Sequence, residues 1–320
     1  MLNEYQKLWA NFHGLLSGIF WGLSGVLLAL VLKDNTLASF FIIPIIIAFL
    51  NDSISLVYMI FYLLYKKNQK AILSIFKEKN NLIISIAAIF GGPMGMSFYI
   101  LAIKNIGIGY TATISALYPA IGTLISFCLL KDRIHKIGLL GLLLAIVCTM
   151  ALGYSASTQV ISGGREIGFL FAFLCALGWG AEVVISSYGM NKNIPSDIAY
   201  FIRQLSSSLG YFILIIVFIH SFPGVIHIFS DIKLSTLLFT TSLAATASYL
   251  FYYRAIEKLR PIRAMALNIT YSIWAIFFSY LIIGEPISVN LLFICSGVSL
   301  GSFLTVVNPR DLKKLRLSLK

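Results

Sequence analysis

Apolar runs of about 20 residues, the length that a helix needs to cross roughly 30 Å of hydrocarbon, recur along this whole chain. Ten such runs can be placed between short polar breaks, at residues 11–32, 36–65, 81–103, 107–130, 136–154, 167–190, 196–219, 233–256, 261–283 and 287–307. Pro44 lies inside the second run, which is long enough to tilt or bend. Only 11% of the residues are charged, against roughly 25% in soluble domains. We therefore expect an all-α integral membrane protein with ten transmembrane helices.

The net charge of +12 indicates orientation rather than a nucleic-acid partner. With the N-terminus in the cytoplasm, the breaks on the cytoplasmic side are the basic ones, among them Lys66, Lys67, Lys70, Lys77, Lys79, Lys131, Arg133 and Lys136, followed by Arg310, Lys313, Lys314, Arg316 and Lys320 at the end. The breaks on the other side carry only Lys33, Lys104, Arg165 and Lys233. The positive-inside rule therefore predicts a multi-pass protein of the cytoplasmic (inner) membrane with both termini in the cytoplasm.

The chain contains an internal repeat. Residues 99–134 align over residues 252–287 without a gap, so that Ala102-Ile103 falls on Ala255-Ile256, Tyr118 on Tyr271 and Ser126 on Ser279. FWGLSG at 20–25 likewise corresponds to GWGAEV at 178–183. We therefore divide the chain into a five-helix repeat at 1–155, a second at 156–307 and a basic cytoplasmic tail at 308–320. Because five is odd, the second repeat enters the membrane from the opposite side, an inverted arrangement typical of secondary transporters with a midplane site.

Three charged side chains lie well inside the predicted spans: Asp52, Glu182 and Arg203. A charge at mid-bilayer costs at least about 2.5–3.5 kcal/mol, so such residues usually face a bundle interior or a cavity and mark function. Trp179, Glu182 and Ser186 share one helix face, so a ring and a carboxylate can approach the same ligand. The alternative is that Glu182 is neutralised by burial or joins two helices. Asp52 can bind a cation, shuttle a proton or pair with Arg203.

Trp21 and Trp179 lie two or three helical turns from the predicted membrane edges, outside the interfacial belt where Trp is usual. Their equivalence in the two repeats places them at one depth, as cavity walls or as packing between helices. Tyr118 and Tyr271, one in each repeat, are further candidates for the cavity wall. Other aromatic residues are left open as wall candidates: Tyr99, Tyr249, Tyr252 and Trp274. The small-residue runs GGPMG at 91–95 and AATAS at 244–248 are places where helices can bend or slide.

Several features together resemble a known family. They are the ten spans in two repeats, Pro119 after SALY, KDRI at 131–134, GEPI at 284–287 and SDIAYFIRQ at 196–204. In these the chain is similar to the EamA-like branch of the drug/metabolite transporter superfamily, which implies that fold. GLLSGIFWGLSG at 14–25, the pair Asn51-Asp52 and the Trp179 region resemble the bacterial choline permeases of the LicB type. That resemblance implies that Trp21 and Trp179 surround a quaternary ammonium, although Asn51 stands where it predicts a histidine.

We therefore expect a secondary transporter, not an enzyme, that moves a small organic cation such as choline by alternating access. A quaternary ammonium has no N–H donor, so aromatic faces hold it, at about 0.5–2 kcal/mol for each cation–π contact. The expected substrate-binding residues are Trp21, Asn51, Asp52, Tyr118, Trp179, Glu182 and Tyr271, and those for charge pairing or coupling are Asp52, Glu182 and Arg203. Direction and coupling ion stay open, as does assembly, for which a homodimer is one option.

Two other functions compete with this one. An exporter of amino acids or cationic drugs has the same scaffold, but a zwitterionic substrate needs a positive group, for which Arg203 is the intramembrane candidate. A membrane enzyme acting on lipid phosphates needs clustered Asp, His or Arg, often with a metal. The histidines are instead scattered at His13, His135, His220 and His227, and the cysteines at Cys128, Cys148, Cys175 and Cys295 show no metal spacing. We expect no cofactor, no metal and no catalytic residue.

Overall fold

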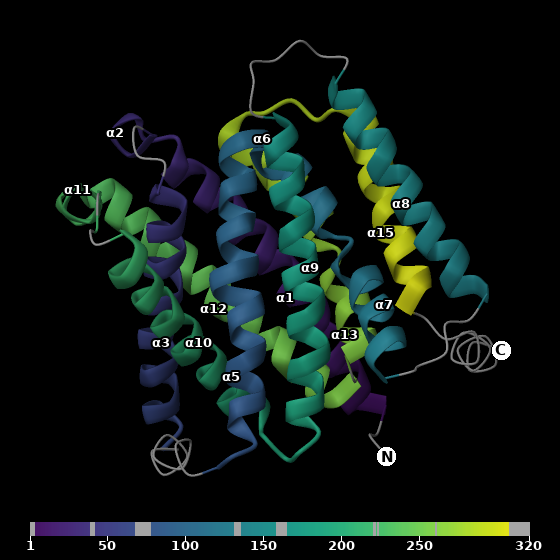
Figure 1. The fold of residues 1–320 in the computed structure, drawn as a ribbon, viewed down its shortest axis with the longest axis horizontal. Helices are drawn as coiled ribbons and strands as arrows, with labels where there is room; N and C mark the ends of the chain where they lie inside the picture. Colours follow the sequence, from purple (N-terminus) through teal and green to yellow (C-terminus); the bar gives the residue numbers. More distant parts are fainter. Residues whose placement is uncertain are drawn as a thin grey trace.

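The computed structural model describes residues 4–38, 42–67, 78–130, 136–157, 165–219, 222, 224–259 and 261–306, and every element in them is a helix (Figure 1). The α-helices are α1 (Glu4–Leu32), α2 (Asn35–Ala38), α3 (Ile43–Tyr65), α5 (Asn81–Ile89), α6 (Ser97–Ser115), α7 (Tyr118–Leu130), α8 (Lys136–Ser157), α9 (Arg165–Met190), α10 (Ser196–Leu214), α11 (Val225–Ser230), α12 (Ile232–Leu259), α13 (Pro261–Asn268), α14 (Tyr271–Phe278) and α15 (Val289–Val306). Three π-helical segments continue some of them, η1 (Phe90–Met96), η2 (Ile215–Ile219) and η3 (Ser279–Ile283). The predicted tail at 308–320, the KDRI motif at 131–134, and His135 and His220 lie outside the described residues.

Seven helical stretches of the described chain are long and apolar enough to cross a membrane: Leu8–Leu32, Ile43–Tyr65, Asn81–Ser115, Glu166–Met190, Ser196–Val217, Ile232–Leu259 and Ala264–Ile283. Lys136–Thr149 and Val289–Leu304 are shorter apolar helices. The protein is therefore a multi-pass, helical membrane protein. The count of ten stays a prediction, because two of the ten spans correspond to the shorter helices and Asn81–Ser115 runs across the predicted boundary between two others.

A kink in α6 at Gly107 marks that predicted boundary. The φ of 76° and ψ of 168° of Gly107 form a conformation that residues with a Cβ rarely adopt. Nothing lies within 4 Å of the place that a Cβ would take, so the backbone angles and not the available space favour glycine. The helical residues that follow, up to Ser115, therefore belong with the predicted fourth span.

The predicted second span, 36–65, divides into two helices, α2 and α3. Pro44 lies in the first turn of α3 and does not bend its middle. A proline suits this place because the first turn of a helix leaves its backbone N–H groups without helical partners. The apolar run thus predicted the helix, whereas the proline marks its beginning.

The predicted fourth and ninth spans are interrupted at equivalent points. The first break lies between Ser115 at the end of α6 and Tyr118 at the start of α7, and the second between Asn268 at the end of α13 and Tyr271 at the start of α14. In the alignment of residues 99–134 over 252–287, Ser115 falls on Asn268 and Tyr118 on Tyr271. Pro119 accounts for the first break, because a proline favours the first turn of a helix over its interior. The second break has no proline.

The two breaks are joined by a reciprocal pair of hydrogen bonds. Ser115 and Tyr271 share one between their hydroxyl oxygens at 2.8 Å, and Tyr118 Oη donates to Asn268 Oδ1 at 3.0 Å. Each bond therefore links the end of one broken helix to the start of the other. Equivalent residues of the two halves exchange roles in the two bonds, as around a two-fold axis.

The helix α1 packs along α12 and also contacts α13 and α14. Its glycines allow a close approach. A Cβ on Gly18 would lie 2.9 Å from the Asn268 carbonyl oxygen, and one on Gly22 would lie 2.9 Å from the Ala275 nitrogen. Small residues at a helix interface give this close contact between membrane helices. The arrangement brings Trp21, on the same helix, to the second half of the chain.

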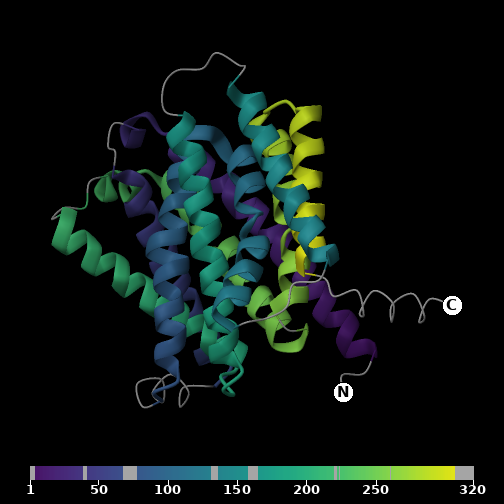
Figure 2. The same ribbon diagram turned by 45° about the vertical axis from the view of Figure 1, so that its right-hand side comes forward.

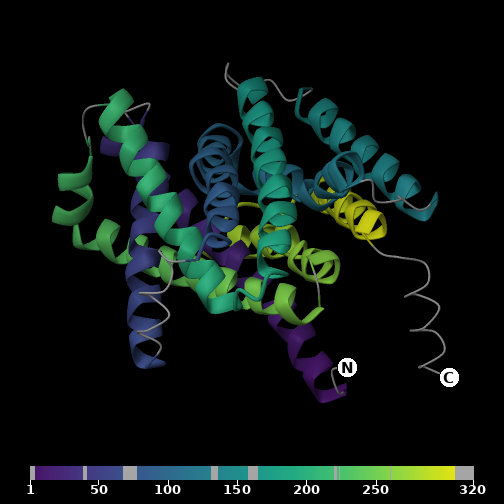
Figure 3. The same cartoon turned by 60° about the horizontal axis from the view of Figure 1, so that its bottom comes forward.

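At one edge of the bundle α8 and α15 lie side by side, and α3, α10 and α11 lie at the opposite edge (Figure 1, Figure 2 and Figure 3). Outward faces at both edges carry exposed apolar side chains, such as Leu140 and Phe293 at the first and Ile213 at the second. Three charged residues of the described chain, Asp52, Glu182 and Arg203, are instead buried inside. An apolar exterior around a polar interior suits a bundle whose solvent is lipid.

Candidate functional site

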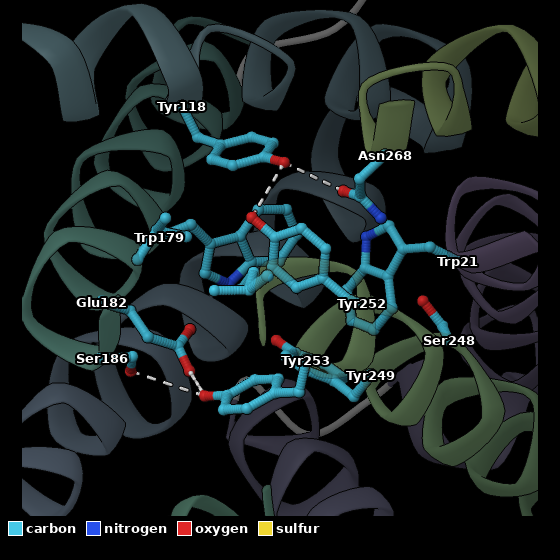
Figure 4. A pocket seen from close by; sticks show the side chains of 12 residues that line it. Trp21, Tyr118, Trp179, Glu182, Ser186, Ser248, Tyr249, Tyr252, Tyr253 and Asn268 are labelled. Carbon is cyan, nitrogen blue, oxygen red and sulfur yellow. Dashed lines mark hydrogen bonds between the residues drawn. The ribbon is translucent and has the colours of Figure 1, made fainter. Parts of the chain in front are cut away.

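A narrow cavity lies among α1, α7, α9, α12 and α13 (Figure 4). Six of its twelve lining residues are aromatic, and the carboxylate of Glu182 faces it. Its lining residues are Trp21, Tyr118, Trp179, Glu182, Val183, Ser186, Ser248, Tyr249, Tyr252, Tyr253, Ile256 and Asn268. Trp179, Glu182 and Ser186 all come from one face of α9, because residues three and four apart on a helix point the same way.

Two tryptophans from the two halves of the chain meet at this cavity. The ring centroids of Trp21 and Trp179 lie 5.3 Å apart with the planes at 73°, and Tyr249 meets Trp21 edge-on at 5.2 Å. Tyr99 packs behind them, 4.9 Å from Trp179. Edge-to-face contacts of this kind fix the rings by their quadrupoles. They also leave ring faces as a surface with partial negative charge, which attracts cations.

Hydroxyl and amide groups form a second part of the wall. Tyr118 Oη, which donates to Asn268 Oδ1, is also 3.4 Å from Tyr252 Oη. Asn268 Nδ2 donates in turn to Ser17 Oγ at 2.9 Å. Figure 4 shows Tyr118 and Asn268 on the far side of the cavity from Glu182 and Ser186. The cavity is therefore bipolar, with a carboxylate at one end and uncharged polar groups at the other.

Glu182 belongs to a buried cluster of charges. Arg203 Nε donates to Glu182 Oε1 at 3.0 Å, while Arg203 Nη1 donates to Asp52 Oδ2, also at 3.0 Å. Ser207 Oγ donates to the same Asp52 oxygen at 2.5 Å. Tyr253 Oη donates to Glu182 Oε1 at 3.5 Å, from the cavity side. One guanidinium thus bridges an acid of α3 and an acid of α9.

The cluster contains two carboxylates and one guanidinium, so it carries one net negative charge when both acids are ionised. All three groups are almost fully buried, with 2% of Asp52, 4% of Glu182 and none of Arg203 exposed. Breaking such a buried pair by removing one partner typically costs about 3–5 kcal/mol, because the remaining charge has no solvent. The excess negative charge next to the aromatic wall favours a cation in the cavity.

The GGPMG segment forms the back of this site as the π-helix η1. A Cβ on Gly91 would lie 1.7 Å from Glu182 Oε2, and one on Gly95 would lie 2.7 Å from Trp179 Cδ1. Trp179 Nε1 donates to the Gly91 carbonyl oxygen at 3.2 Å, and Tyr211 Oη donates to that of Gly92 at 2.8 Å. The π-helical turn leaves carbonyl groups available for such bonds. These glycines therefore let the Trp and the carboxylate lie directly against the backbone.

Replacing Gly91 by Ala is expected to weaken binding of an organic cation about tenfold, the effect of losing about 1.4 kcal/mol. The new Cβ displaces the end of a flexible side chain rather than backbone, so the fold tolerates it, but the Glu182 carboxylate is forced out of the position in which it faces the cavity. Gly109→Ala is the control, because its Cβ meets only side-chain carbons of Leu291 and Ile276. Equal binding by both variants and the wild type would contradict this role.

The residues that the sequence indicated fall into two groups. Trp21, Tyr118, Trp179 and Glu182 line the cavity. Three others lie behind its wall. Asp52 reaches Glu182 only through Arg203, and Asn51 Oδ1 accepts a hydrogen bond from Ser242 Oγ at 3.1 Å. The ring of Tyr271 lies 6.4 Å from that of Trp179 and its hydroxyl bonds to Ser115.

The sequence left Tyr249 and Tyr252 open as wall candidates and did not single out Tyr253. Tyr249, Tyr252 and Tyr253 all line the cavity, on the α12 stretch YLFYY at 249–253. Several tyrosines close together in the middle of an apolar span indicate a polar interior surface, since a buried hydroxyl needs a hydrogen-bond partner. Asn268 carried no such signal, because its position at a helix break was not predicted.

Comparisons with known proteins agree with the fold and extend over almost the whole chain. The EamA-like transporter family model matches residues 8–154 and 166–307. Protein LicB of Haemophilus influenzae is 36% identical over 295 residues, which cover 92% of this chain and 96% of LicB. A crystal structure 18% identical in sequence superposes with a TM-score of 0.64 over 95% of this chain and 98% of that one, a likeness of fold alone.

Proposed function

Because this chain belongs to the EamA-like transporter family, within the drug/metabolite transporter superfamily, we propose that it is a secondary transporter of a small organic cation. Choline or a related quaternary ammonium is the best candidate substrate. The observation that carries the proposal is the cavity, where two tryptophans and a carboxylate in a net negative cluster face one space. The protein would work by alternating access in the cytoplasmic membrane, with no catalytic step.

We propose an architecture of two inverted five-helix repeats, residues 1–155 and 156–307, with ten transmembrane helices. The family model matches the chain twice, in halves of similar length. The breaks at Ser115 and Asn268 are equivalent, and the hydrogen bonds between them are reciprocal. Trp21 and Trp179, which are equivalent in the repeats, meet at the cavity. A site between inverted repeats is what alternating access requires, since each repeat can close over it in turn.

The orientation with both termini in the cytoplasm is also a proposal. It follows from the basic breaks such as Lys66 and Lys67, and α1 begins at the same end of the bundle at which α15 ends (Figure 1). Uptake of a monovalent cation would then follow the inside-negative membrane potential, which supplies about 2.3 kcal/mol per 100 mV. The partners are the lipid bilayer and the substrate, and a homodimer stays one option for assembly.

The chemistry of the cavity favours a quaternary ammonium with a small polar end. Each aromatic face supplies about 0.5–2 kcal/mol to a cation that offers no N–H donor. Tyr118 and Asn268, at the end of the cavity away from Glu182, can hydrogen bond a hydroxyl group. Choline has both features, a trimethylammonium head and a hydroxyl two carbons away.

A second candidate is export of cationic drugs or metabolites through the same cavity. It is favoured by the fact that aromatic walls accept many organic cations. Export of zwitterionic amino acids is disfavoured, because a substrate carboxylate needs a positive partner. Arg203 bridges Glu182 and Asp52, and no part of it is exposed to the cavity.

Ligand binding by the purified protein tests this proposal. Choline and tetramethylammonium are expected to quench Trp fluorescence and to raise the melting temperature, because a ligand at 100 times its Kd stabilises the folded state by about 2.7 kcal/mol. Neutral amino acids should do neither. Stabilisation by amino acids without any effect of choline would replace the cation proposal by amino-acid export. Uptake of labelled choline by liposomes that contain only this protein then separates transport from binding.

A further inference from the structure

A cation lies directly behind the cavity wall, the guanidinium of Arg203. It donates to Glu182 Oε1 through Nε, and its Cζ lies 4.5 Å from the centroid of the Tyr249 ring. Tyr249 Oη also accepts a bond from Nη2 at 3.1 Å. Glu182 and Tyr249 both line the cavity. Arg203 therefore uses a carboxylate and an aromatic ring that an organic cation in the cavity would use.

The two sides of the guanidinium are not equivalent. Nε faces Glu182, which lines the cavity, whereas Nη1 faces Asp52, which does not. Nη1 also donates to Gln204 Oε1, and Ser207 holds the same Asp52 oxygen. A cation that enters the cavity can therefore displace Arg203 from Glu182 without displacing it from Asp52. The bonds to Asp52 and Gln204 would keep the arginine in place while Glu182 turns to the substrate.

We propose that Arg203 is a tethered cation that competes with the transported cation for Glu182 and neutralises that carboxylate when the cavity is empty. The inference rests on the proposed function, since it presumes a cationic substrate. To complete a cycle of net transport, the empty transporter must also reorient its site from one side of the membrane to the other. Burying an unpaired carboxylate during that change is unfavourable, and Arg203 removes this barrier. The tethered cation therefore permits return of the empty transporter and net uptake rather than exchange alone.

The competition has a consequence for affinity. The apparent Kd equals the intrinsic Kd divided by the fraction of molecules in which Glu182 is free, so a paired Glu182 weakens binding in proportion. An arginine suits this role better than a lysine. Its planar fork reaches two carboxylates at once and stacks on an aromatic ring, whereas an ammonium is a point charge.

The test compares Arg203→Gln with the wild type in three measurements. Tetramethylammonium binding by Trp fluorescence is expected to tighten about tenfold, as Glu182 becomes free of its competitor. Net uptake of labelled choline into empty liposomes is expected to fall at least tenfold. Exchange into liposomes preloaded with choline should stay within about threefold of the wild type, because a substrate occupies Glu182 during each reorientation. Weaker binding with an equal loss of net uptake and exchange would overturn the proposal.

Two milder variants keep the test decisive if Arg203→Gln does not fold. Tyr249→Phe keeps the ring and removes only the hydroxyl that Nη2 contacts, so tetramethylammonium binding should tighten severalfold while the melting temperature stays close to the wild type. Arg203→Lys keeps the charge and should retain part of the net uptake of the wild type. Unchanged or weaker binding in Tyr249→Phe would contradict the competition. If the wild type binds no quaternary ammonium, the proposed function fails. If the wild type binds one but Arg203→Gln and Tyr249→Phe bind it more weakly, only this inference fails.

Discussion

Glu182→Gln is expected to weaken choline binding and uptake at least 100-fold, about 2.8 kcal/mol at 1.4 kcal/mol per tenfold change. The glutamine has the same shape and can still accept a bond from Arg203. The cluster, however, changes from one net negative charge to none, because Asp52 and Arg203 then balance each other. A cation leaving water for a buried cavity then meets no opposite charge. Coupling energies of close buried charge pairs, about 1.5–7 kcal/mol where measured, support an effect of this size.

Glu166→Gln is the matched control for this change. Glu166 lies in the first turn of α9, the same helix, and does not line the cavity. Both variants should reach the membrane in amounts similar to the wild type, which a fluorescent tag measures. Choline uptake unchanged in Glu182→Gln, with equal expression, would remove Glu182 from the substrate site and leave it as a partner of Arg203 only.

The second large effect is expected at the two tryptophans. Trp179→Leu should weaken tetramethylammonium binding about tenfold, and Trp21→Leu by a similar factor, because each removes a cation–π contact of about 0.5–2 kcal/mol. The double variant is not expected to show the product of the two effects. The ring centroids lie 5.3 Å apart, so each ring also orients the other. The effects of mutations at residues in contact are seldom additive.

A neutral analogue distinguishes cation binding from simple filling of space. The compound 3,3-dimethylbutan-1-ol has the shape of choline without its charge, so the wild type should prefer choline and the Trp variants should lose most of that preference. Trp9→Leu serves as the control, since Trp9 lies near the start of α1, is 47% exposed and does not line the cavity. An equal loss of affinity for choline and for the alcohol would assign the tryptophans to packing.

Part of this site was predictable from the spacing of residues along α9. The spacing of Trp179, Glu182 and Ser186 placed them on one face, and all three line the cavity. The correspondence of Trp21 to Trp179 was readable from FWGLSG and GWGAEV. Such features lie within one helix turn or repeat at a fixed register, so they need no knowledge of how helices cross. The proposed orientation rests on the same kind of information, because loop charges are a local property.

Contacts between helices were not predictable in the same way. Asn51, Asp52 and Tyr271 lie behind the cavity wall, whereas Tyr249, Tyr252, Tyr253 and Asn268 line it. Which side of a tyrosine-rich helix faces inward depends on the rotation of that helix against its neighbours, and hydropathy in a membrane does not fix it, because lipid and packed side chains are equally apolar. The break at Asn268 also carries no proline.

The sequence by itself determined that this protein is a bundle of membrane helices with three charges that must be inside it. Segment hydropathy and spacing are local, and the cost of a charge in lipid is nearly independent of the fold. Only the tertiary structure decided how those charges pair. Arg203 meets Asp52 and Glu182 through helices that are distant in sequence, and that pairing puts one carboxylate against the cavity and the other behind it. Partners of this kind are selected by helix crossing and close glycine contacts, which no single segment contains.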